Sequence, residues 1–126
     1  MRARLPLMPS WTARRRTLGA LYRREFSSSR SVTVPPECDP GHVYHLFPVL
    51  ARSREALQAH LAGAGIGTLV HYPTALHQQP AFAAYPADCP IAARVASQVC
   101  SLPLHPHLSD ADARIVAEAV RAFAPA

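Results

Sequence analysis

One stretch decides how this chain is organised: Ala64-Gly65-Ile66-Gly67-Thr68-Leu69-Val70-His71-Tyr72-Pro73-Thr74-Ala75-Leu76-His77-Gln78-Gln79-Pro80-Ala81-Phe82. Its glycines allow a helix to end and the backbone to turn sharply. The β-branched and apolar residues 66–70 predict a short strand. His71, Tyr72 and His77 follow the end of that strand, in a loop that prolines restrict. Because enzymes often display polar groups on such supported loops, we expect any contact with a small molecule to lie here.

Before this stretch the sequence predicts a helix and a longer strand. Ser53 is the expected N-cap of a helix over 54–62, in which Leu57 and Leu61 share one buried face and which Gly63 and Gly65 end. The apolar run 42–51 predicts a strand covered on both faces. Its two expected faces are Val43, His45, Phe47 and Val49, and, opposite them, Tyr44, Leu46 and Leu50. Pro48 argues against pairing at its own position, because proline cannot donate to a ladder and belongs at an edge or a bulge.

The beginning of the chain predicts a basic amphipathic helix. Residues 1–9 contain Pro6 and Pro9 and are expected to be irregular, and Ser10 is the expected N-cap of a helix over 11–26. The apolar face of that helix would hold Trp11, Leu18, Leu21, Tyr22 and Phe26, with Arg14, Arg15, Arg16, Arg23 and Arg24 mostly elsewhere. Residues 32–34 predict a short strand, and Asp39-Pro40-Gly41 is typical of a turn.

After the central stretch the pattern becomes helical again. Ile91, Val95 and Val99 are spaced as one face of a helix over 91–99, and residues 101–104 predict a brief extended segment. Ser109 and Asp112 form a variant of the capping box that begins a final helix. The buried stripe of that helix is expected to be Ile115, Val116, Ala119, Val120 and Phe123.

The order helix, strand, helix, strand, helix, helix predicts a small layered α/β domain, a short sheet covered by helices. At 126 residues the chain is long enough for one domain and shows neither an internal repeat nor a second core, so residues 1–126 are expected to form a single domain. No stretch approaches the roughly 18 apolar residues of a membrane helix, so we expect no transmembrane span.

The composition limits the chemistry that the chain can perform. All 13 basic residues are arginine, so no lysine amine is available for a Schiff base with a carbonyl cofactor. The cysteines Cys38, Cys89 and Cys100 are odd in number and show no paired spacing. No secretory signal precedes them, and reduced thiols in a cytoplasm are the simplest interpretation.

The positive charge is concentrated near the start of the chain, where residues 1–36 carry eight arginines and one acid, Glu25. An arginine- and serine-rich beginning is also typical of an organellar transit peptide. A basic amphipathic helix could instead lie on nucleic acid or on an anionic membrane. We favour a solvated face on a packed helix over these alternatives, and expect neither nucleic-acid nor membrane binding.

Other site chemistries find little support. Two groups of possible zinc ligands are close in sequence: Cys38 with His42 and His45, and separately His105 with His107. Neither group has the paired spacing of zinc ligands, so no metal site is expected. Cys100 is expected to lie on the helix that Ile91, Val95 and Val99 mark, whose apolar face should be buried. This placement favours a structural thiol over a Cys-His nucleophile. Gly63, Gly65 and Gly67 precede a strand, whereas a phosphate-binding glycine loop opens a helix.

The remaining candidates for a binding site are His71, Tyr72 and His77. Their imidazole and phenol groups suit hydrogen bonding to hydroxyl-rich or phosphorylated ligands.

The central stretch contains three short segments: Gly65-Ile66-Gly67-Thr68, His71-Tyr72-Pro73 and Leu76-His77-Gln78-Gln79-Pro80-Ala81. Together they resemble the C-terminal domain of the DegT/DnrJ/StrS sugar aminotransferases, which are fold-type-I enzymes that use pyridoxal phosphate. Four further segments extend the resemblance over nearly the whole chain: Trp11 to Tyr22, His42 to Phe47, Cys89-Pro90 with Ser101 to Leu104, and Leu108-Ser109-Asp110. Two positions depart from the family pattern, Pro48 in a strand and Ala75 where proline is common.

This resemblance implies a small domain that packs against a large domain which these residues do not include. In the family the large domain supplies the Schiff-base lysine, the acid that pairs with the pyridine nitrogen, and most phosphate contacts, so no catalytic residue carries over to this chain. The loop after the strand lines the sugar side of the active site, which implies that His71, Tyr72 and His77 face the substrate, with His77 the best single candidate.

The sequence therefore predicts a part of a nucleotide-sugar aminotransferase, which transfers an amino group, commonly from glutamate, to a keto-sugar through pyridoxal phosphate. Alone, the chain is expected to bind no pyridoxal phosphate and to be inactive. The expected partners are a nucleotide-sugar substrate and a large domain or a homodimer partner. The alternative is a non-catalytic regulatory module that pairs with a full-length homologue.

Overall fold

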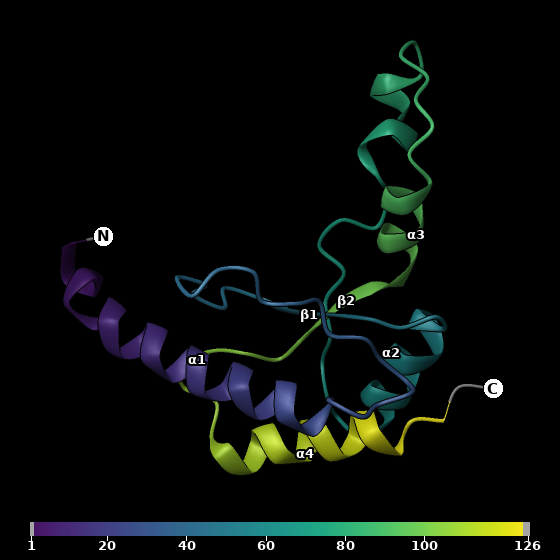
Figure 1. The fold of residues 1–126 in the computed structure, drawn as a ribbon. Coiled ribbons are helices and arrows are strands. Elements are labelled where there is room, and N and C mark those ends of the chain that lie inside the picture. The colour runs from purple at the N-terminus through teal and green to yellow at the C-terminus, as the bar shows by residue number, and fades with distance from the viewer. Residues whose placement is uncertain (1, 125–126) are drawn as a thin grey trace.

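The structure is a computed structural model that describes residues 2–124 (Figure 1). In chain order its elements are the 3₁₀ turn η1 (Arg2–Leu7), α1 (Met8–Glu25), β1 (Phe47–Leu50), α2 (Arg54–Gly63), the 3₁₀ turns η2 (Leu76–Gln78) and η3 (Pro80–Phe82), α3 (Pro90–Gln98), β2 (Val99–Leu102) and α4 (Asp110–Ala122). Helices α1 and α4 lie side by side on one side of the sheet, and α2 packs against α4. This arrangement is the predicted short sheet covered by helices.

The sheet consists of β1 and β2, which pair antiparallel with Phe47 opposite Leu102 and Leu50 opposite Val99. An isolated bridge flanks each strand, Thr33 with Leu50 on the outer side of β1 and Leu69 with Ser101 on the outer side of β2. The strands predicted at 32–34 and 66–70 are thus each reduced to one bridge. Both segments lie next to the sheet, but each pairs with it at a single residue.

Pro48 lies inside β1, opposite Ser101. Two residues further on, the Leu50 N–H donates to Thr33 at 2.9 Å and the Leu50 carbonyl accepts from Thr33 at 2.8 Å, both on the side away from β2. Residues two apart in a strand direct their N–H groups to the same edge. The nitrogen of Pro48 therefore faces the outer edge, where no ladder hydrogen bond is lost. Proline is compatible with a strand at such a position.

Of the predicted strand over 42–51, only Phe47–Leu50 forms a strand, because residues 42–46 approach β1 as irregular backbone. Tyr44 has a positive φ of 49°, which no regular strand accommodates. Its ring is buried and stacks on Phe47 with the ring centroids 6.2 Å apart. Val43 and His45, which the alternation placed on the side of Phe47, are exposed instead. The alternation fails because the backbone is not extended at Tyr44.

Helix α1 begins at Met8, three residues earlier than predicted, and the expectation of irregular structure before residue 10 is wrong for the described residues. Pro9 lies in the first turn, where its missing N–H has no intrahelical partner to lose and its fixed φ favours the helix. Ser10 is therefore inside the helix, and its hydroxyl donates to the Leu7 carbonyl at 2.9 Å. The predicted buried face is confirmed at Leu18, Leu21, Tyr22 and Phe26.

Helix α2 follows the prediction closely. Leu57 and Leu61 are fully buried, the helix ends at Gly63, and Gly65 takes a positive φ of 74° that favours glycine. Ser53 is at the N-cap position, but its side chain makes no capping hydrogen bond.

Helix α3 ends at Gln98, so the predicted helix over 91–99 is one residue too long and Val99 begins β2. The Gln98 carbonyl accepts from the Ala51 N–H at 3.0 Å, which starts the pairing of the two strands. Cys100 consequently lies in the centre of β2 and not on a helix, although its predicted burial is confirmed at 1% exposure. Burial raises the pKa of the Cys100 thiol, which supports a structural role for this residue.

Helix α4 begins where the capping pattern predicts, since the Ser109 hydroxyl accepts from the Asp112 N–H at 3.0 Å. Its buried stripe is Ala113, Val116, Ala117 and Val120, continued by Phe123. Ile115 was predicted in this stripe, but it is 54% exposed. The stripe follows the i, i+3, i+4, i+7 positions from Ala113, and Ile115 lies off that face.

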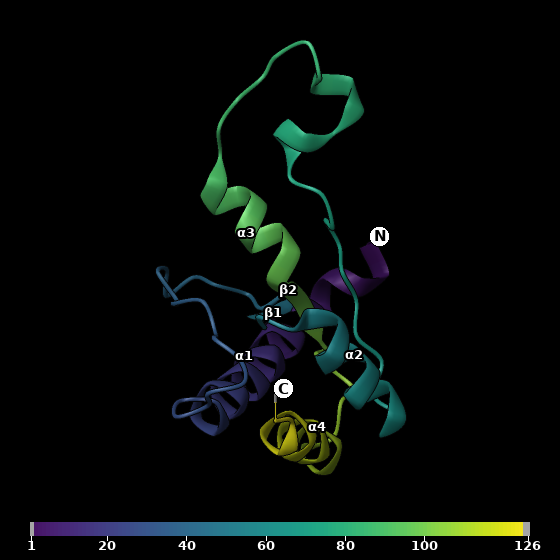
Figure 2. The same cartoon turned by 90° about the vertical axis from the view of Figure 1, so that its right-hand side faces the viewer.

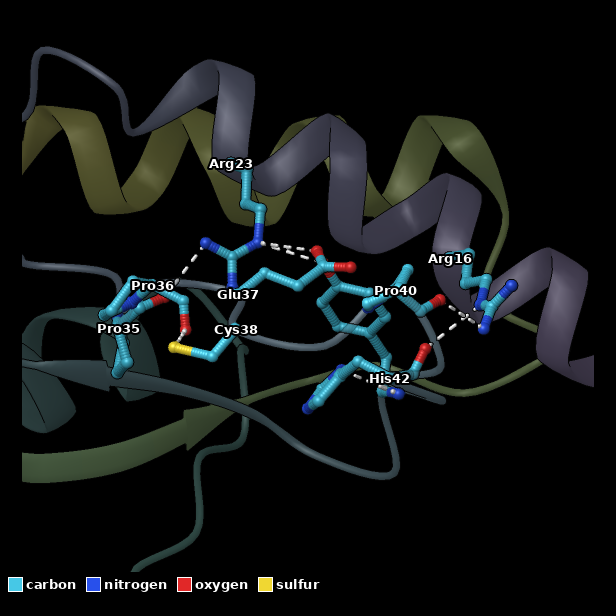
Figure 3. A network of polar contacts seen from close by, with 9 residues as sticks. Arg16, Arg23, Pro35, Pro36, Glu37, Cys38, Pro40 and His42 are labelled. Carbon is cyan, nitrogen blue, oxygen red and sulfur yellow. Dashed lines mark hydrogen bonds and ion pairs between the residues drawn. The ribbon is translucent and has the colours of Figure 1, made fainter.

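Several arginines of α1 hold the chain's own backbone. Arg23 donates to the Tyr44 hydroxyl and to the Pro35 carbonyl, both at 2.9 Å, and approaches Glu37 to 3.5 Å. Arg16 donates to the carbonyls of Pro40 and His42 (Figure 3). The Tyr44 hydroxyl also hydrogen bonds with Glu37. These contacts fasten the irregular segment before β1 to α1, so most of this basic face is used within the fold.

Among residues 2–124, no helix has the length and apolar character to cross a membrane.

Candidate functional site

The residues predicted to face a ligand lie on an arm that projects from the body of the fold. The chain leaves the sheet after Leu69, passes through η2 and η3, and returns along α3 to β2 (Figures 1 and 2). The arm carries large apolar side chains in contact with solvent: Tyr72, Leu76, Phe82, Tyr85 and Ile91. In the segment 70–75, between the sheet and η2, Ala75 is the only buried residue.

His71 lies at the base of this arm, where the sheet fixes the backbone. Leu69 and Ser101 exchange two backbone hydrogen bonds, at 3.2 and 2.8 Å, which hold the chain two residues before His71. The imidazole is exposed and its Nδ1 lies 3.4 Å from the hydroxyl oxygen of Ser101, a side chain that is itself buried. This contact occupies Nδ1, and Nε2 has no hydrogen-bond partner among the residues that the structure describes, so it is available to a ligand.

Tyr72 and His77 lie further along the arm. Tyr72 is 79% exposed, so its phenol can meet a ligand or another polypeptide. His77 is half-buried in the 3₁₀ turn η2, which is closed by a hydrogen bond of 2.9 Å from the Gln78 N–H to the Ala75 carbonyl. The structure thus places all three predicted residues on one arm.

A groove of about 380 Å³ opens beside His71. His71 and His105 both line it, and its walls include the apolar side chains of Leu46, Leu69 and Leu102. Tyr72 and His77 do not line this groove. An apolar groove with a few polar groups at its edge is a common form of small-molecule site.

His105 is the residue of this groove that sequence reasoning missed. The sequence suggests His105 only as a metal ligand together with His107, whereas the structure places it in the lining of the same groove as His71. The available signal was its position directly after Leu104, where the segment 101–104 leaves the sheet. In the central stretch, His71 likewise follows the end of a predicted strand.

The residues weighed for other chemistries are not brought together. In the described part of the chain, no three His, Cys, Asp or Glu side chains are close enough to hold a metal ion. Cys38 is exposed, Cys89 is partly exposed and Cys100 is buried, and all three thiols are free.

Comparison with known proteins gives a consistent result. The model of the DegT/DnrJ/EryC1/StrS aminotransferase family matches residues 1–121. The chain is 41% identical over 130 aligned residues to the dTDP-3-amino-3,4,6-trideoxy-alpha-D-glucose transaminase of Streptomyces venezuelae, covering 98% of this chain and 34% of that protein. It is 40% identical to the erythromycin biosynthesis sensory transduction protein EryC1 of Saccharopolyspora erythraea, covering 86% of this chain and 31% of that protein.

Solved structures agree in fold. The crystal structure of S. venezuelae DesV in complex with a ketimine intermediate superposes with a TM-score of 0.89 and 38% identity, over 95% of this chain and 33% of that one. The aminotransferase TlmJ from Streptoalloteichus hindustanus gives a TM-score of 0.84 and 31% identity, over 95% of this chain and 33% of that one. The chain spans about a third of the length of these relatives. The expected fold class, the small C-terminal domain of a fold-type-I aminotransferase, is confirmed.

Proposed function

The chain belongs to the DegT/DnrJ/EryC1/StrS aminotransferase family, and on that premise we propose that its residues form the substrate-side part of a nucleotide-sugar aminotransferase. The whole reaction would transfer an amino group from an amino acid, commonly glutamate, to a keto-sugar nucleotide. Relatives named as transaminases of dTDP-linked sugars support this substrate class. The observation that carries the proposal is the arm, which holds the predicted site residues on an exposed and apolar surface.

The chain's own residues do not fit covalent attachment of pyridoxal phosphate, because none of the 126 residues is lysine. We therefore assign the cofactor to polypeptide outside these residues. Pyridoxal phosphate, where it is bound, supplies the electron sink for amino transfer. The present residues would contribute binding and orientation of the sugar nucleotide.

His71, Tyr72 and His77 are the proposed substrate contacts. The free Nε2 of His71 can donate to or accept from a sugar hydroxyl or a phosphate oxygen. The Tyr72 phenol is exposed and offers one donor and two acceptor positions. His77 is held by a closed turn, which would place its imidazole precisely once the arm is covered.

The apolar side chains of the arm support a polypeptide partner in addition to a small ligand. Tyr72, Leu76, Tyr85 and Ile91 are each more than 60% exposed, which is unusual for side chains of this size so close together. We propose that the large domain of the enzyme or a second subunit covers this arm and completes the pocket. The three free thiols are compatible with the proposed cytoplasmic location.

The binding proposal is tested by titrating the chain with dTDP and following the imidazole signals by NMR. We expect the signals of His71 and His77 to shift while the signal of His45, which is exposed on another loop, stays unchanged. Shifts confined to His45, or none at His71 and His77, would count against the assigned face.

The cofactor assignment is tested separately. The purified chain mixed with pyridoxal phosphate and borohydride should give no lysine adduct by mass spectrometry and no transamination of glutamate. Turnover in a sample verified as pure would overturn this assignment.

A further inference from the structure

A second groove, of about 700 Å³, lies on another part of the molecule and shares no lining residue with the groove at His71. The segment before β1, the ends of β1 and α3, and the residue before α2 enclose it. Its lining includes the guanidinium-bearing side chains Arg30, Arg52 and Arg94. No aspartate or glutamate is among the described residues that line it.

These three arginines differ from most others in that their side chains have no hydrogen-bond or ion-pair partner among residues 2–124. Seven arginines hydrogen bond or form ion pairs with other residues: Arg14, Arg15, Arg16, Arg23, Arg24, Arg54 and Arg121. Of the described arginine side chains without such a contact, Arg30, Arg52 and Arg94 line this groove, and Arg4 and Arg114 lie elsewhere. Three unpaired guanidinium groups around one hollow form a concentrated positive potential.

The groove also offers neutral hydrogen-bonding groups. Thr33, Ser53 and Gln98 line it, and none of these side chains has a hydrogen-bond partner among the described residues. Ser53 precedes α2 without capping it, so its hydroxyl remains available to a ligand. Val32, Leu50 and Val95 form an apolar floor.

We propose that this groove binds a small molecule that carries two or more phosphate charges, such as a nucleoside diphosphate. Guanidinium groups recognise phosphate oxygens through paired, charge-assisted hydrogen bonds. A multiply charged ligand would engage more than one of the three arginines, and the apolar floor would accept a base or another flat organic group. The volume is within the range of small-molecule sites. This site is independent of the proposed transaminase function.

The test is a calorimetric titration of the full chain with inorganic pyrophosphate, in wild type and in four variants. Arg52→Gln and Arg94→Gln each remove one charge from the groove. Arg114→Gln is the matched control, because Arg114 is exposed on α4, has no side-chain partner in the described part of the chain and carries the same charge. His71→Gln reports on the other groove.

We expect saturable binding to the wild type, weakened about tenfold by Arg52→Gln and by Arg94→Gln, as the loss of a charge-assisted hydrogen bond predicts. Arg114→Gln and His71→Gln should each stay within about twofold of wild type. Absence of saturable binding would overturn the proposal. Equal weakening by Arg114→Gln would show a general charge effect, and loss of binding in His71→Gln would place the ligand in the other groove; either result also overturns it.

Discussion

The ring of Tyr44 lies directly against the backbone of Gly19 on α1. A Cβ atom built on residue 19 would be 2.7 Å from Cε1 of that ring, a separation that real contacts do not reach. Tyr44 is held in this place by its positive φ and by the bonds of its hydroxyl to Arg23 and Glu37. Gly19 therefore lets the segment before β1 pack onto α1.

Gly19→Ala should destabilise the protein by about 1–3 kcal/mol, the usual cost of forcing extra atoms into a packed region. This cost opposes the gain of about 1 kcal/mol that alanine normally gives inside a helix. Urea denaturation followed by circular dichroism measures the net effect.

Gly63→Ala is the matched control, because a Cβ there meets nothing within 4 Å and the residue ends α2 without a positive φ. It should be neutral or stabilise by up to about 1 kcal/mol. Equal effects of the two substitutions would contradict the close contact between Gly19 and Tyr44.

Ser109→Ala should cost about 1 kcal/mol, since the hydroxyl that accepts from the Asp112 N–H caps α4. Ser53→Ala offers a comparison at the same position of α2, where the side chain makes no capping bond, and should cost much less. Thermal unfolding of the two variants ranks them. If Ser53→Ala proved the more damaging, the assignment of the caps would be wrong.

Tyr22 should make the fold sensitive to alkaline pH. Burial raises the pKa of Tyr22 above its ordinary value of 10.0, so the folded state holds the phenol proton more tightly than the unfolded state. The stability from this shift is fully present below pH 10.0 and is lost as the pH rises further.

Tyr22→Phe should reduce the fall in unfolding free energy between pH 9 and 11, measured by urea titration. It should also cost about 1 kcal/mol near neutral pH, because it removes the hydrogen bond of 2.9 Å that the Tyr22 hydroxyl donates to the Pro103 carbonyl. Tyr72→Phe, at an exposed position, should change neither quantity. An unchanged alkaline profile in Tyr22→Phe would argue against burial of this phenol.

The three cysteines should react with iodoacetamide at very different rates. Cys38 is exposed and should be alkylated first, whereas Cys100 is 1% exposed in β2 and its thiol pKa is raised by burial. Mass spectrometry of the native chain should find Cys100 unmodified until urea unfolds the protein. Early alkylation of Cys100 would contradict the placement of β2 in the core.

Local patterns predicted the helices well, and long-range pairing explains most of the errors. Leu57 and Leu61, or Ser109 and Asp112, act within one or two turns, so their spacing alone defines a helix. The extent of β1 depends instead on β2, about fifty residues later, and on the left-handed backbone at Tyr44. No alternation of side chains reveals either of these features.

The candidate site was only partly accessible to sequence reasoning. His71, Tyr72 and His77 could be proposed from the sequence because they share one short stretch that follows a predicted strand. His105 joins His71 only because Leu69 and Ser101 bring two distant segments together. The arginine groove brings together residues from three stretches of the sequence, 30–33, 50–53 and 94–98. Which arginines are left without a partner depends on the contacts that the fold gives to each of them.

The central claim is that these residues form the substrate side of a sugar aminotransferase. The most direct measurement uses a chimera in which this chain replaces the matching third of the S. venezuelae transaminase, with the KM for its sugar nucleotide and the rate of the amino-donor half-reaction determined separately. The account predicts an active chimera in which His71→Gln or His77→Gln raises that KM about tenfold and leaves the half-reaction unchanged, as for a lost substrate contact. A folded chimera that transfers no amino group to the sugar would contradict the account. A chimera whose KM for the sugar nucleotide is unchanged by both substitutions would contradict it as well.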